Sequence, residues 1–121
     1  MGRVPKLSTP ADMPADVCLA INVMGNKVRT EILYHLSCRP QTSGELAERV
    51  GVHLTSVHRP LCLLEHHGLI TADVESGHRR GQTVTWRTDV QKVGQLGCLW
   101  VAHATGKHVS AVMSDDSRQQ N

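Results

Sequence analysis

The chain has 121 residues, enough for one domain of ordinary size, and its formal net charge is +2. Hydrophobic residues make up 40% of the chain but aromatics only 2%, with no phenylalanine, a composition that suits packed helices better than a β-sandwich. The charge alone is too small to indicate nucleic-acid binding, which depends on where the cations lie.

The N-terminal part of the chain predicts an arm followed by two short helices. Residues 1–14 contain three prolines, which interrupt helices, so we expect a flexible arm there. A first helix is predicted over residues 15–24 and ends at Gly25. A second helix begins after Asn26, a suitable N-cap, and covers residues 27–36 or slightly more.

Two further helices, joined by a tight turn, are predicted in the middle of the chain. Thr42 and Glu45 match a capping box and start a helix that ends at Gly51. The next helix covers residues 54–67 and ends at Gly68. Its expected core-facing residues are Leu54, Val57, Leu61 and Leu64. Such helix pairs recur in DNA-binding proteins because the second helix fits the major groove.

A β-hairpin and a long helix follow. Strands are predicted over residues 69–74 and 83–87, on either side of a turn segment. Thr88 and Gln91 match a second capping box, which starts a helix running from residue 89 to about 105.

The predicted fold class is mainly α with a small β-hairpin (α+β). The expected order is four helices, two strands and a last helix, the order of a winged helix-turn-helix. The domain would span residues 15–108, and the polar residues 109–121 would form a disordered tail.

The outer face of the fourth helix and the hairpin tip carry groups suited to DNA. Hydroxyl and N–H groups at a helix N-terminus bind phosphate, and Arg59 could contact guanine through two hydrogen bonds. Arg79 and Arg80 would form a mobile basic tip that reaches the minor groove or the backbone. The alternatives are that Thr55 and Ser56 only cap the helix, and that the arginines lie in a solvated turn. The predicted DNA-binding residues are Thr42, Ser43, His53, Thr55, Ser56, His58, Arg59, His78, Arg79, Arg80 and Gln82.

The segment VHLTSVHRPLCLLEHHGLI, residues 52–70, resembles the recognition helix and first wing strand of ArsR-type winged-helix repressors. Residues 24–33 resemble the motif that opens the family's domain, and residues 44–47 resemble its first helix-turn-helix element. The resemblance covers roughly residues 18–105. It departs from the family at Pro60, which removes a helical hydrogen bond and should bend the fourth helix.

The resemblance implies a homodimer in which the first and last helices pack across a two-fold axis. Each recognition helix would then read one half of a near-palindrome. The apolar stripe of the last helix is wider than one small core absorbs, and Gly94 and Gly97 would allow helices to approach closely. The alternative is that this stripe belongs to the chain's own core. The predicted interface residues are Leu19, Val93, Leu96, Gly97, Trp100 and Ala104.

Eight histidines and four cysteines raise the question of a metal site. The family's C-x-C motif would fall in residues 45–49, which hold no cysteine, and its D-x-H motif is absent at residues 89–91. Cys62 and His66 share a helix face, but two ligands are too few for structural zinc. Cys18 and Cys98 could approach each other across a dimer layer. We predict no metal and no cofactor, and the effector is unknown.

The leading function is a sequence-specific, double-stranded-DNA-binding transcriptional regulator, acting as a homodimeric repressor. The alternative is a plasmid- or phage-type winged-helix adaptor in partition, replication or assembly. An enzyme is not expected, because the sequence has no phosphate loop, no catalytic triad order and no paired carboxylates. Unpaired cysteines, with neither a signal peptide nor a membrane-spanning stretch, predict a cytoplasmic protein without a membrane partner.

Overall fold

The computed structural model describes residues 13–107, so the predicted tail and all but the last two residues of the predicted arm lie outside the described residues. No helix in the described range is long and apolar enough to cross a membrane. The elements in chain order are α1 (Ala15–Met24), α2 (Lys27–Cys38), β1 (Gln41–Thr42), α3 (Ser43–Val50), α4 (Leu54–His66), β2 (Ile70–Ala72), β3 (Thr85–Thr88) and α5 (Val90–Ala104).

The predicted fold class is confirmed, with one strand more than expected. The sheet is antiparallel with the order β1-β3-β2, so β3 is central and pairs Trp86 with both Gln41 of β1 and Ala72 of β2. The strands predicted over residues 69–74 and 83–87 are shorter in the structure. The two residues of β1 are too few to show the alternation of a strand in sequence, so no strand was predicted there.

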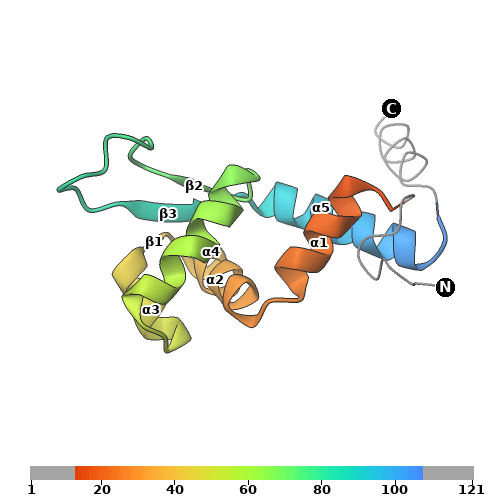
Figure 1. Cartoon of the computed structure of the whole chain (residues 1–121), viewed down its shortest axis with the longest axis horizontal. Coiled ribbons are helices and arrows are strands. Elements are labelled where there is room, and N and C mark those ends of the chain that lie inside the picture. Colours follow the sequence, from red (N-terminus) through yellow and green to blue (C-terminus); the bar gives the residue numbers. More distant parts are fainter. Residues whose placement is uncertain (1–12, 108–121) are drawn as a thin grey trace, which may run out of the picture. The chain divides into compact units, whose positions relative to one another are not determined.

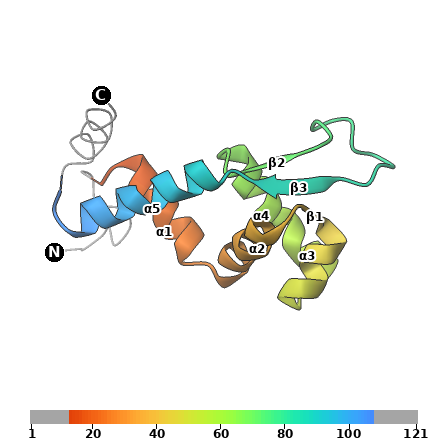
Figure 2. The same cartoon turned by 180° about the vertical axis from the view of Figure 1, so that it is seen from behind.

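The described chain divides into two compact units, residues 23–94 and residues 13–22 with 95–107. In the larger unit, α2, α3 and α4 pack on one another and on the sheet, and the loop between β2 and β3 projects beyond these helices (Figures 1 and 2). The burial of apolar surface stabilises this core by about 25 cal/mol for each Å² removed from water. Its buried residues include Ile32, Leu36, Leu46, Val57, Leu61, Leu64, Ile70 and Trp86.

Most of the predicted helix ends are confirmed. The Asn26 side chain accepts a hydrogen bond from the Arg29 backbone N–H at 2.9 Å, which caps α2. The capping box of α3 is complete: Thr42 Oγ1 accepts from the Glu45 N–H at 3.2 Å, and Glu45 Oε1 accepts from the Thr42 N–H at 2.9 Å. Gly51 and Gly68 end their helices at φ of 82° and 75°, a backbone conformation that favours glycine.

Two sequence predictions were wrong, one about a helix cap and one about the burial of a residue. Thr88 does not cap α5, because it pairs with Ile70 in the sheet and its hydroxyl donates to the Leu69 carbonyl at 3.4 Å. The cap is Asp89, whose Oδ1 accepts from the Lys92 N–H at 3.1 Å. Leu54 does not join the core: it is the first residue of α4, at the turn, and is 48% exposed.

Candidate nucleic-acid interface

The turn between α3 and α4 sets the position of the second helix. The N–H groups of Gly51 and Val52 both donate to the Ala47 carbonyl, at 2.9 and 3.0 Å, and close the end of α3. His53 then has an extended backbone and is the N-cap of α4, but its side chain makes no capping hydrogen bond. The Ser56 N–H donates to the His53 carbonyl at 2.9 Å, but no side chain accepts from the first N–H groups of α4. N–H groups at a helix start that have no acceptor in the chain bind anions.

The outer face of α4 is polar and exposed, as the sequence predicts. His53, Thr55, Ser56, His58 and Arg59 are all exposed, while Val57 and Leu61 on the opposite face are buried. Within the described residues, the Thr55 and Ser56 side chains make no hydrogen bond, so they do not cap α4. The helix continues through Pro60.

Thr42 and Ser43, also predicted to contact DNA, both take part in structural contacts. The backbone N–H of Thr42 donates to the Glu45 carboxylate, and this hydrogen bond holds the pKa of Glu45 below its usual value. The hydroxyl oxygen of Ser43 accepts a hydrogen bond from Trp86 Nε1 at 3.1 Å. The Ser43 hydroxyl proton is still able to bind a phosphate oxygen.

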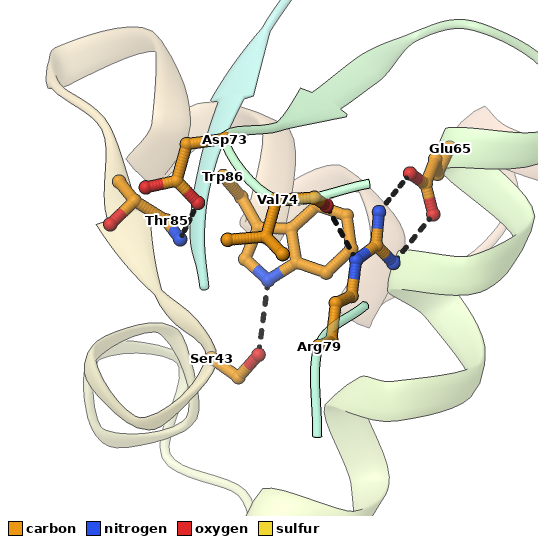
Figure 3. A network of polar contacts seen from close by, with 7 residues as sticks. All are labelled: Ser43, Glu65, Asp73, Val74, Arg79, Thr85 and Trp86. Carbon is orange, nitrogen blue, oxygen red and sulfur yellow. Dashed lines mark hydrogen bonds and ion pairs between the residues drawn. The ribbon is translucent and has the colours of Figure 1, made fainter. Parts of the chain in front are cut away.

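The two arginines of the predicted basic tip have different environments. Arg79 is turned back onto α4, where its guanidinium bonds both carboxylate oxygens of Glu65, at 2.6 and 3.1 Å (Figure 3). Arg80 is exposed and makes no hydrogen bond within the described chain. The expectation of a free arginine pair is thus corrected: Arg79 is held by an acidic partner that the sequence did not reveal.

The other predicted residues of the hairpin tip are exposed. The backbone N–H of His78 donates to the Glu75 carbonyl at 3.0 Å, and that of Gln82 to the Arg79 carbonyl at 2.9 Å, so the loop contains two tight turns. The Gln82 side-chain amide donates to the His78 carbonyl at 3.3 Å. Gly77 and Gly81 have φ of 97° and 74°, which explains the glycines at these turns.

The residues predicted for a dimer interface differ in exposure. Leu96 is buried within the single chain, so for this residue the intrachain core is the better interpretation. Trp100 and Ala104 are exposed. Leu19, Val93 and Gly97 are half-buried. The smaller unit also exposes Ile21 and Val101, which are not among the predicted interface residues.

No cluster of three or more metal-ligating side chains occurs among residues 13–107. All four cysteines are free thiols, and Cys38, Cys62 and Cys98 are exposed. Cys18 is half-buried.

Comparison with known proteins shows what this arrangement resembles. A family profile described as "Helix-turn-helix domain" matches residues 24–72. The chain is 32% identical over 93 residues to the HTH-type transcriptional regulator KmtR of Mycobacterium tuberculosis, and the match covers 74% of this chain and 68% of that protein.

Solved structures share the fold at lower identity. An ArsR-like transcriptional regulator from a Rhodococcus species superposes with a TM-score of 0.58 at 19% identity, covering 88% of this chain and 92% of the other. A homodimeric winged helix-turn-helix DNA-binding domain from Mycobacterium bovis, a possible ArsR-family regulator, superposes with a TM-score of 0.54 at 20% identity. That match covers 93% of this chain and 96% of the other.

Proposed function

The chain belongs to the ArsR family of winged helix-turn-helix transcriptional regulators, and on that premise we propose that it is a homodimeric repressor of a near-palindromic DNA operator. The observation that carries the proposal is the first turn of α4. Its backbone N–H groups have no side-chain cap, its outer side chains are polar and exposed, and its opposite face is buried. A helix of this kind enters a major groove without exposing the core.

Each part of the surface would have its own role in binding. The N–H groups and hydroxyls at the start of α4 would bind phosphate and set the register of the helix. Arg59, exposed and one turn further along, would contact a guanine edge. Arg80, in the loop between β2 and β3, would bind the neighbouring DNA backbone or minor groove. The chain would act by binding and not by catalysis.

The smaller unit supports the dimer. Ile21 on α1 and Trp100 and Val101 on α5 are large apolar side chains that a single chain leaves exposed. A Cβ placed on Gly97 meets no atom within 4 Å, so a second helix has room to approach there. The M. bovis domain with the same fold is homodimeric. A symmetric dimer presents two recognition helices, which favours a near-palindromic site and repression by occlusion of a promoter.

Selection of duplexes from a fragmented genomic library with the purified protein tests the proposal. We expect a near-palindromic consensus bound by two chains, with steep salt dependence. Binding without sequence preference at physiological salt would contradict a specific repressor and favour the adaptor function. If the selected duplexes share only a single half-site, the result would contradict binding as a homodimer.

A further inference from the structure

We propose that Arg79 is a positioning residue, which holds the wing (residues 73–84) against the recognition helix α4 and does not itself contact DNA. The inference rests on the proposed DNA-binding function and assigns a role within it. It starts from the polar network drawn in Figure 3, which joins α4, the wing, β3 and α3 inside the larger unit.

The guanidinium of Arg79 is already occupied by partners within the chain. Its Nη1 and Nη2 donate to Glu65 Oε1 and Oε2 at 3.1 and 2.6 Å, a two-pronged arrangement that only arginine makes. Its Nε donates to the Val74 carbonyl at 2.8 Å. The side chains of Arg79 and Glu65 are 23% and 29% exposed, so the pair is partly shielded from water.

A third partner of the guanidinium is the ring of Trp86. Its central carbon lies 5.0 Å from the centre of the Trp86 ring, within the range of a cation–π interaction. Trp86 is 5% exposed and donates its indole N–H to Ser43 at the start of α3. Arg79 thus joins the wing to both helices of the helix-turn-helix, to α4 directly and to α3 through Trp86.

The charge of Arg79 is neutralised where it lies. The hydrogen bonds that Arg79 donates to Glu65 raise the pKa of the guanidinium above its ordinary value, so Arg79 keeps its charge. A phosphate could bind Arg79 only by displacing the carboxylate. Arg80, with no such partner in the described chain, is the cation of the wing that remains available.

The backbone shows how Arg79 positions Arg80. The Arg79 carbonyl accepts the Gln82 N–H at 2.9 Å and closes the tight turn that contains Arg80. Holding the side chain of Arg79 therefore holds the first residue of that turn. Loss of the Glu65 contact would release the turn and lower the fraction of molecules whose wing is ready to bind.

The deciding variant is Glu65→Gln, because it should change the affinity for the operator in opposite directions depending on whether Arg79 binds phosphate or positions the wing. If Arg79 contacts phosphate, the variant removes the negative charge of Glu65 and leaves the Arg79 guanidinium free to bind DNA, so the affinity for the operator rises. If Arg79 positions the wing, affinity falls, by about 3- to 10-fold for one weakened charge-assisted contact. Glu75→Gln is the matched control, because Glu75 is an exposed carboxylate of the wing. Its replacement changes the net charge by the same amount as Glu65→Gln but leaves the contacts of Arg79 intact. Affinity for E65Q equal to or above that for E75Q overturns the proposal.

Arginine variants separate positioning from phosphate binding. Arg79→Lys keeps the charge but loses the paired hydrogen bonds, so we expect it to weaken binding nearly as much as Arg79→Ala while leaving the salt dependence close to wild type. Arg80→Ala should reduce the slope of log affinity against log salt by about 1. Wild-type affinity for R79K, or a slope reduced by about 1 in R79A, overturns the proposal.

Hydrogen exchange of the free protein tests the same contact without DNA. In E65Q the amides of residues 75–82 should exchange several-fold faster than in E75Q, with the α2 and α3 amides unchanged. Equal exchange in the two variants overturns the proposal even if DNA binding fails. Wild-type protein that binds no operator would instead refute the proposed function, so the two failures are distinguishable.

Discussion

The indole nitrogen of Trp86 donates a hydrogen bond to the hydroxyl of Ser43 at 3.1 Å, across 43 positions of sequence. Ser43 is the first residue of α3 and Trp86 lies in the central strand β3, so the bond ties the start of the helix-turn-helix to the base of the wing. Because Trp86 is almost fully buried, its N–H has little access to water as a replacement acceptor.

Replacement of Ser43 by Ala should therefore lower the free energy of unfolding by about 1 kcal/mol, since it leaves a buried donor without a partner. Urea denaturation at a fixed protein concentration measures the change. In a Trp86→Phe background the same replacement should cost much less, because the donor is gone. An equal loss of unfolding free energy in both backgrounds would show that the hydrogen bond between Trp86 and Ser43 does not stabilise the protein.

Replacement of Gly68 by Ala should destabilise the protein by about 1–2 kcal/mol, because φ of 75° is unfavourable for any residue with a Cβ. The new Cβ would also lie 2.9 Å from Lys92 Nζ, the end of a flexible side chain that moves easily. The cost should persist in a Lys92→Ala background. Gly44→Ala is the control: it lies within α3, has no atom within 4 Å of a new Cβ, and should stabilise by up to about 1 kcal/mol.

The capping box makes the stability of α3 depend on pH. The folded-state pKa of Glu45 lies below its unfolded value, so its contribution is present above the unfolded pKa and lost as pH falls through the folded pKa. The difference in unfolding free energy between wild type and Glu45→Gln should be constant near neutral pH and shrink as the pH falls into the acidic range where the carboxyl group becomes protonated. Denaturation midpoints at a series of pH values measure it, and a difference independent of pH would argue against the ionised cap.

Arg59→Ala should lower affinity for the operator and relax selectivity at one base pair per half-site, at a cost of about 1–3 kcal/mol per half-site. Arg59→Lys should not restore selectivity, because lysine lacks the two-pronged geometry that matches guanine. Competition with single-base operator variants measures the effect. A uniform loss over all sequences would show that Arg59 binds phosphate instead.

Trp100→Asp should shift the protein from dimer to monomer, because it places a charge in the proposed apolar contact. Tyr34→Asp is the matched control: Tyr34 is also a large exposed side chain, but it belongs to α2 and is not among the predicted interface residues. Sedimentation velocity over a range of concentrations distinguishes the two variants. Equal dimerisation of both variants would rule out Trp100 as an interface residue.

Local signals predicted most of the fold correctly. The N-caps at Asn26 and Thr42 and the helix-ending glycines at positions 51 and 68 each depend on contacts within a few residues. The exposed face of α4 follows from helical periodicity, which also needs no distant partner. The contacts of these exposed residues with DNA stay predictions.

The wing shows what depends on the tertiary structure alone. Two arginines between glycines look equivalent in sequence, yet Arg79 is held by Glu65, 14 positions away, and Arg80 is not. Thr88 matches a capping box in the sequence, but in the structure it pairs with Ile70 in the sheet, and Asp89 caps α5 instead. A local pattern predicts what a side chain is able to do, whereas long-range packing selects which partner it meets, because only the folded chain brings distant groups within hydrogen-bonding distance.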